Sequence, residues 1–101
     1  MTEKIIEGIK YLLEEETLTA EVIKNQNGYR GNIIIPETIV FNEVTYRVTS
    51  VGKQAFFNCF SLTSVVIPNS VTSIGRDAFG GCDSLKSIVI SNGVTSIGEA
   101  A

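Results

Sequence analysis

A 23-residue segment occurs twice in succession in this chain, and a third copy begins after it. Thr49–Val71 is followed by Thr72–Val94, and 13 of the 23 paired positions are identical. The third copy opens at Thr95 and stops after seven residues, at Ala101. Self-similarity at a fixed period of this size is typical of solenoids, in which each repeat forms one coil and packs only on its neighbours. The repeat therefore predicts a solenoid, and the truncated third copy leads us to expect a piece of a longer chain.

Apolar residues recur at fixed places in the repeat and predict two short strands in each coil, which stack into parallel sheets. The expected inward residues are Leu62, Val65, Ile67, Leu85, Ile88 and Ile90 on the first strand, Val71, Val94, Val51, Ile74 and Ile97 on the second, and Ala55, Ala78, Phe56 and Phe79 after it. Proline has no donor for a strand ladder, so Pro68 is expected to end the first strand. Gly52, Gly75 and Gly98 follow the second strand, where we expect a positive φ at a corner.

The segment before the repeats, residues 1–48, carries eight acidic and five basic residues. Apolar residues alternate with polar ones in Ile5–Leu13 and in Thr17–Lys24, most clearly at Leu18, Ala20 and Val22. This period of two predicts a β-hairpin that turns at the run of glutamates, residues 14–16. A helix over residues 3–16 is the alternative, although a glycine within it, at position 8, would cost about 1 kcal/mol.

Residues 25–28, Asn-Gln-Asn-Gly, predict a turn, and Asn-Gly is a strong hairpin signal. Gly31–Ile39 then resembles the strand region of the repeat, with an Ile-Pro pair in common, and indicates a degenerate first coil. An insertion follows, in which Asn42-Glu43 lies between two apolar segments and predicts a small protruding hairpin. A solenoid needs a cover for its first coil. We therefore expect residues 1–48 to form an N-terminal β cap with the degenerate coil, and residues 49–101 to form two full repeats and one truncated repeat.

Two cysteines, Cys59 and Cys82, lie 23 residues apart and so occupy the same place in successive coils. Stacked positions should lie about 4.8 Å apart, as neighbouring strands do. Their side chains would point in parallel, whereas a disulfide needs Cβ atoms turned toward each other. The spacing favours free, buried thiols that act as small apolar side chains, and a disulfide in a secreted protein is the alternative.

Composition argues against several classes of function. The net charge is −3 without a basic stripe, which disfavours nucleic-acid binding. No apolar run approaches the roughly 18 residues of a membrane-spanning helix, so we expect no membrane insertion. There is no histidine to act as a base near neutral pH, and neither cysteine has an activating partner in sequence. We expect no enzyme activity, cofactor or metal, with the glutamate run solvated and Gly80-Gly81 forming only a turn.

Residues 71–90, from Val-Thr-Ser-Ile-Gly through Ala-Phe, Cys and Leu to Ile-Val-Ile, resemble the repeat of BspA-like leucine-rich repeat proteins. The resemblance covers Thr49–Ala101, with a looser likeness over Gly31–Ile39. It implies a mainly β, right-handed leucine-rich-repeat solenoid with 23-residue coils and an N-terminal β-hairpin cap. It also implies a cell-surface or secreted protein of a bacterium or protozoan that binds host matrix proteins or other cells. A cytoplasmic location is the alternative, because no apolar leader follows Met1.

The first functional hypothesis is a non-catalytic protein-interaction or adhesion module, part of a longer bacterial surface protein. Its expected binding strip consists of the outward residues of the first strand and their successors one repeat later, namely Ile34, Thr63, Ser64, Val66, Lys86, Ser87 and Val89. The alternative is a structural or self-assembling solenoid segment without a dedicated ligand. In that case the open C-terminal coil, with the edge of Ser87–Ile90 and Ile97 uncovered, would form a homo-oligomer.

Overall fold

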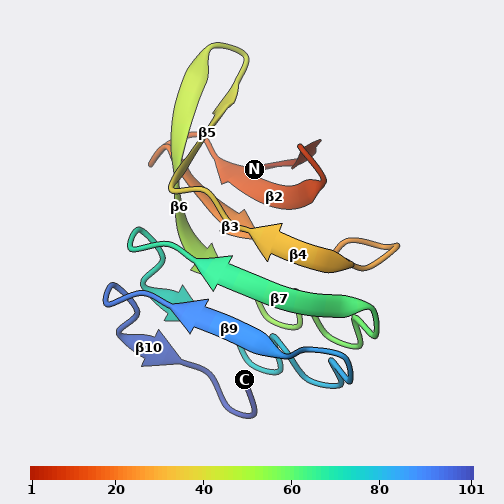
Figure 1. Ribbon diagram of the computed structural model, residues 1–101. Coiled ribbons are helices and arrows are strands. Elements are labelled where there is room, and N and C mark those ends of the chain that lie inside the picture. Colours follow the sequence, from red (N-terminus) through yellow and green to blue (C-terminus); the bar gives the residue numbers. More distant parts are fainter.

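Ten β-strands and no helix make up the chain in the computed structural model, which describes residues 1–101 (Figure 1). The strands are β1 (Thr2–Ile6), β2 (Ile9–Glu14), β3 (Thr19–Val22), β4 (Gly31–Ile34), β5 (Thr38–Phe41), β6 (Val44–Val51), β7 (Leu62–Ile67), β8 (Ser73–Ile74), β9 (Ser87–Ile90) and β10 (Ser96–Ile97). No helix of the structure has the length and apolar character needed to cross a membrane.

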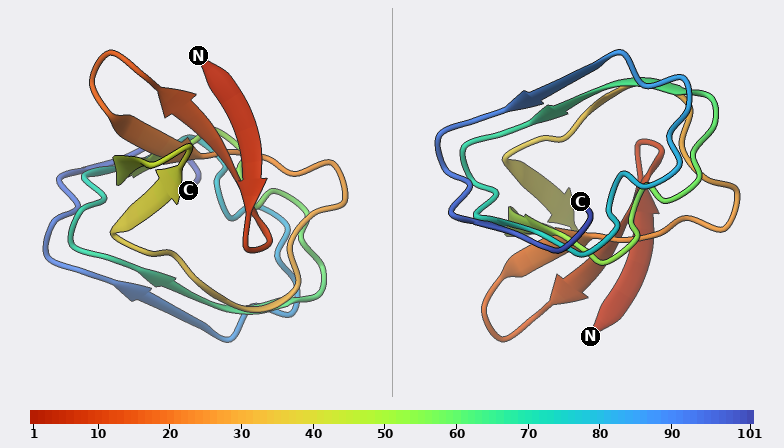
Figure 2. Two further views of the ribbon diagram at one scale, coloured as in Figure 1. Left: turned by 90° about the horizontal axis from the view of Figure 1, so that it is seen from above. Right: turned by 90° about the horizontal axis from the view of Figure 1, so that it is seen from below.

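The strands form two sheets on opposite sides of a coiled chain, and Figure 2 shows successive coils superposed when viewed along the stack. The long sheet has the order β1-β2-β3-β6-β8-β10, with β5 paired to β6, and the short sheet has the order β4-β7-β9. In the regular coils, Ser64 pairs in parallel with Ser87, 23 residues later. The mainly β solenoid with 23-residue coils is therefore confirmed, while its handedness stays a prediction.

The first coil is longer than the others because it contains the inserted hairpin. Asn32 of β4 pairs with Ser64 of β7, an offset of 32 residues. Within that coil, β5 and β6 pair antiparallel around Asn42 and Glu43, both of which adopt a positive φ, at 51° and 65°. The predicted hairpin of the insertion is confirmed, while the assignment of residues 1–48 to a cap with a degenerate first coil stays a prediction.

The N-terminal segment extends the long sheet, since β3 pairs in parallel with β6 and in antiparallel with β2. The predicted hairpin around the glutamate run is confirmed, and the alternative helix does not form. Two details were wrong. The chain also turns at Glu7-Gly8 and adds β1 as a further antiparallel strand. Leu18 does not face inward with Ala20 and Val22, because it lies in the turn with a φ of 56° and is 46% exposed.

The turn at residues 25–28 is confirmed, with the N–H of Gly28 donating to the carbonyl of Asn25 over 2.8 Å. It does not close a hairpin, because the strands on either side of it, β3 and β4, belong to different sheets. The Asn-Gly pair correctly predicts the local backbone conformation, because Gly28 is left-handed with a φ of 71°. It does not predict which strands lie on either side of the turn. Here that geometry makes a corner of the first coil.

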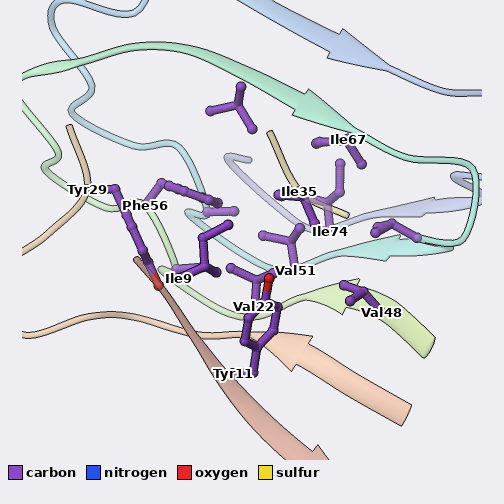
Figure 3. Packing of buried hydrophobic residues seen from close by; sticks show 14 of the residues in the cluster. Ile9, Tyr11, Val22, Tyr29, Ile35, Val48, Val51, Phe56, Ile67 and Ile74 are labelled. Carbon is purple, nitrogen blue, oxygen red and sulfur yellow. The ribbon is translucent and has the colours of Figure 1, made fainter. Parts of the chain in front are cut away.

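A single apolar core runs through the coil between the two sheets (Figure 3). The inward positions of the first full repeat are buried as predicted, and so are those that begin the second, at Ile74, Ala78 and Phe79. Phe56 lies at the centre of an aromatic stack, with ring centroids 4.8 Å from Tyr29 and 5.1 Å from Phe79. Rings at this spacing attract each other beyond their area of burial, so the stack ties three successive coils together.

The apolar positions of the last strands are not buried as predicted. Ile88, Ile90 and Ile97 are 37%, 45% and 60% exposed, while Leu85 and Val94 are partly buried. The reason is that a residue in a solenoid is covered from both sides by neighbouring coils, and in this structure no coil packs on the outer side of β9 and β10. The alternating pattern of apolar residues is present in these strands, but the apolar side chains are buried only where a further coil packs on them.

The repeated glycines after the second strand do not adopt the positive φ that we expected, because φ is positive only at Gly8, Gly28, Gly31 and Gly81 among the glycines. These glycines are required instead because the backbones of successive coils come too close together there to admit a side chain. A Cβ atom on Gly98 would lie 2.5 Å from the backbone nitrogen of Arg76, in the preceding coil. The repeated glycine thus marks a place where stacked backbones almost touch.

Both cysteines are free, as predicted, but only one is fully buried. The N–H of Tyr29 donates to Cys59 Sγ over 3.4 Å, within the core. Cys82 is half-buried, and its thiol donates to the carbonyl of Phe56 over 3.0 Å. Burial raises the pKa of the Cys82 thiol, which lowers the fraction present as the reactive thiolate.

Candidate protein-binding surface

The outer face of the short sheet brings the predicted strip residues together. We use the name outer strip for these residues, which lie on β4, β7 and β9 or directly before β9: Ile34, Thr63, Ser64, Val66, Lys86, Ser87 and Val89. Parallel pairing aligns them in rows across the strands. Ile34 pairs with Val66, and Val66 pairs with Val89. The three aliphatic side chains therefore form one continuous row.

This aliphatic row is open to solvent. Ile34 is 70% exposed and Val89 is 52% exposed, with the half-buried Val66 between them. Neighbouring strands lie about 4.8 Å apart, so the row spans about 10 Å across the face of the sheet. Single exposed apolar residues are common on protein surfaces, whereas large contiguous patches mark interaction sites, so this row is a candidate for one.

A polar row runs beside the aliphatic one and is joined by hydrogen bonds. Asn32, Ser64 and Ser87 are aligned by the same register. The side-chain oxygen of Asn32 accepts hydrogen bonds from the hydroxyls of Ser64, over 2.7 Å, and Thr63, over 3.0 Å. These bonds fix the polar edge of the strip across the β4–β7 pair.

Sequence reasoning missed Asn32 as a member of this surface. The signal was available, because Asn32 lies two residues before Ile34 just as Ser64 lies two residues before Val66. Lys86 supplies the only charge of the outer strip, and it takes part in none of the ion pairs of the structure. The backbone N–H of Lys86 donates to the carbonyl of Thr63 over 2.9 Å, which places the two residues side by side.

The remaining candidate groups have local structural partners. Glu15 accepts a hydrogen bond from Thr2 over 2.6 Å and pairs with the N-terminal amine over 3.1 Å. These contacts lower the pKa of Glu15, with the Thr2 hydroxyl first among the causes. Nowhere do three or more His, Cys, Asp or Glu side chains gather as metal ligands would. Gly80-Gly81 lies in a turn, as predicted.

Tyr11 and Tyr29 are buried in the core next to the first coil. The hydroxyl of Tyr29 donates to the carbonyl of Ile23 over 2.7 Å and accepts from the N–H of Lys10 over 3.0 Å. It therefore joins the N-terminal hairpin to the turn before β4. Burial raises the pKa of Tyr11 and of Tyr29 to about 12.

Comparison with known families and structures identifies one repeat family. Residues 32–101 match the family model described as BspA type leucine-rich repeat region (6 copies). No curated protein matches the chain.

Among solved structures, a leucine-rich cell surface protein of Faecalibacterium prausnitzii is 31% identical, with a TM-score of 0.78, and the match covers 97% of this chain and 27% of that one. A leucine-rich repeat protein of Bacteroides capillosus is 26% identical, with a TM-score of 0.85 and coverage of 98% and 72%. A leucine-rich repeat protein of T. pallidum is 28% identical, with a TM-score of 0.75 and coverage of 95% and 42%. The chain thus spans about a quarter of the F. prausnitzii protein that it matches.

Proposed function

Since the chain belongs to the BspA-type leucine-rich repeat family, we propose that it is a non-catalytic protein-interaction module and that it binds its partner through the outer strip. Repeat proteins of this kind present extended surfaces for binding. The likeness to a leucine-rich cell surface protein supports a place on the cell surface or among secreted proteins, as part of a longer adhesion protein. A cytoplasmic location is the alternative.

The observation that carries this proposal is the exposed aliphatic row of Ile34, Val66 and Val89. Its branched side chains stand on a hydrogen-bonded sheet, so little conformational entropy is lost when a partner covers them. The small hydroxyl residues beside the row leave the face shallow, and Lys86 places a positive charge at one end. Such a face suits a protein surface with apolar side chains and a nearby carboxylate, because the two charges then attract across the contact.

We propose in addition that residues 1–48 act as a cap for the repeats in residues 49–101. The support is that β1–β3 occupy one end of the long sheet, and Figure 2 shows them crossing part of the end of the coil. A solenoid end without such cover would expose both apolar surface and strand edges.

The second candidate function is self-association through the last coil. It is favoured by the exposure of Ile88, Ile90 and Ile97 and by the free edges of β9 and β10. Two copies would bury these residues and complete the strand ladders. Light scattering over a wide concentration range tests this, since a mass that rises with concentration supports it and a constant monomer mass refutes it.

A paired substitution tests the outer strip. Val66→Glu with Val89→Glu places two charges in the aliphatic row, and we expect capture of protein partners from bacterial or host surface extracts to fall at least tenfold. Leu18→Glu is the matched control, because Leu18 is an exposed apolar residue in the turn between β2 and β3, which belong to the long sheet. Equal capture by both variants, with both folded by circular dichroism, would place the binding site elsewhere.

A further inference from the structure

A hollow of about 330 Å³ lies at the N-terminal end of the solenoid, outside the regular repeats. The turn between β1 and β2 forms one wall with Ile6 and Glu7, β5 forms another with Ile39 and Val40, and the end of β4 contributes Ile34 and Pro36. Six of its nine lining residues are apolar, and Ile34 and Val40 are 70% and 60% exposed. The volume suits one large apolar side chain from another molecule.

The strand beside this hollow, β4, has one free edge. It pairs only with β7, and nothing covers its other side in the order of the short sheet. The N–H groups of Gly31 and Ile35 donate to carbonyls on the β7 side, those of Ser61 over 2.9 Å and Val66 over 3.0 Å. Backbone groups alternate in direction along a strand. Those of the intervening residues, Asn32 and Ile34, therefore point away from β7 and toward the open side.

The N-terminal strands cover the edge of the long sheet but not the edge of the short sheet, which leaves the edge of β4 open. In the long sheet, β3 pairs with the first-coil strand β6 and so covers its edge. In the short sheet, no strand takes the corresponding place beside β4, which pairs only with β7. Free edges pair with extended chains, and natural proteins usually cover or charge them.

The only charged residue that lines the hollow, Glu7, is acidic. Its side chain is exposed and takes part in no ion pair of the structure. The nearby Lys4 is placed over the ring of Phe41, 5.2 Å from its centroid. The rim thus favours a ligand that carries positive charge next to an apolar group.

From these features we infer that β4 and the hollow form a site for an extended peptide segment, which adds as a strand to the free edge of β4 and places an apolar side chain, flanked by lysine or arginine, in the hollow. In this mode main-chain hydrogen bonds supply affinity, and a pocket for one side chain supplies specificity. The inference deepens the proposed function and rests on it, because it names the kind of partner segment and its place of binding. It shares Ile34 with the outer strip but uses the sheet edge rather than the sheet face.

Selection from a displayed library of random nonapeptides on the full chain tests this inference. We expect enrichment of peptides with an apolar residue flanked by Lys or Arg. A synthetic nonapeptide of the selected sequence should bind Val40→Lys, which places a positive charge in a wall of the hollow, at least tenfold more weakly than the original chain. It should bind Val89→Glu, on the outer strip, with unchanged affinity. In the complex, amide exchange at Asn32 and Ile34 should slow at least tenfold.

The outcomes separate the two proposals. If no peptide is enriched above background, or if Val40→Lys binds the selected peptide normally, the hollow is not a peptide site and this inference is overturned. Loss of peptide binding in Val89→Glu alone would also overturn it, while supporting the outer strip. Peptide binding that depends on Val40, together with partner capture that is unchanged by Val66→Glu and Val89→Glu, would support the hollow and refute the outer strip.

Discussion

A Cβ atom on Gly75 would lie 2.5 Å from the backbone nitrogen of Lys53, which belongs to the preceding coil. The same place one coil earlier, Gly52, is less crowded by rigid atoms. A Cβ atom there would first meet Glu21 Oε2, at 2.8 Å, which is the end of a flexible side chain. A side chain at Gly75 would thus meet backbone atoms, whereas one at Gly52 would first meet a movable side chain. Alanine substitutions at the two positions should therefore differ in their effect on stability.

Gly75→Ala is expected to destabilise the chain by about 1–3 kcal/mol or more, because backbone atoms of a stacked coil must shift to admit the methyl group. Gly52→Ala should cost less, since the Glu21 carboxylate can move aside. Urea unfolding followed by circular dichroism gives both free energies of unfolding. A larger loss for Gly52→Ala would contradict the view that backbone approach between coils requires the glycine.

Phe56→Ala is expected to lower the free energy of unfolding by about 3–5 kcal/mol, as large-to-small changes in a core do. Phe56 lies between two aromatic rings and is fully buried, whereas Phe79 has a ring on one side and slightly more exposure. Phe79→Ala should therefore fall at the lower end of this range. The same urea titrations check the order, and a smaller loss at Phe56 would refute the role of the aromatic stack.

The stability of the fold should fall at alkaline pH because of two of the buried tyrosines, Tyr11 and Tyr29. Their pKa is raised to about 12 in the folded chain, against about 10 in unfolded peptides. Between these values the unfolded chain releases protons that the folded chain retains. The free energy of unfolding then declines as the pH rises, by up to about 1.4 kcal/mol per pH unit for each tyrosine.

Urea titrations at pH 9 and pH 11 measure this decline. Tyr11→Phe is the matched control, because it removes one of the two ionisations and should lessen the slope. An unchanged free energy of unfolding between the two pH values would show that neither phenol is held protonated by the fold.

The two thiols should react at different rates in the folded chain. Cys82 is half-buried and Cys59 is buried, so a thiol reagent at pH 8 should modify Cys82 first, and slowly because burial raises its pKa. Both should react at once in denaturant. Mass spectrometry of peptides after timed labelling identifies the site. Faster modification of Cys59 would contradict the core packing of Tyr29 over it.

The solenoid could be predicted from the sequence because the same pattern of residue types recurs in each coil. The 23-residue period, the inward aliphatic positions and the end of β7 at Pro68 all follow from residue type and spacing. The reason for the repeated glycine did not follow, because a positive φ and a close backbone approach select the same residue. Only the structure, which shows the backbone of the preceding coil beside Gly75, assigns this glycine to the second cause.

The outer strip was also within reach of the sequence, because strand alternation separates Val66 from the inward residues on either side of it. The sequence could not predict which contacts each residue makes with the neighbouring coils. Burial of Ile88 depends on a coil stacked against it, and the hydrogen bonds of Asn32 depend on a register across 32 residues. The hollow beside β4 depends on a turn at Glu7-Gly8 that the alternating pattern did not distinguish from a continuous strand.

Photo-crosslinking from a single position tests the role of the outer strip most directly. A photoreactive residue is placed at Val89 or, as a control of similar exposure, at Leu18, and the full chain is irradiated with extracts of bacterial and host surface proteins. We predict adducts from Val89 that an excess of the original chain suppresses and that an excess of the chain with Val66→Glu and Val89→Glu does not. Equal yields from Leu18 and Val89, or equal suppression by both competitors, would contradict binding through the outer strip.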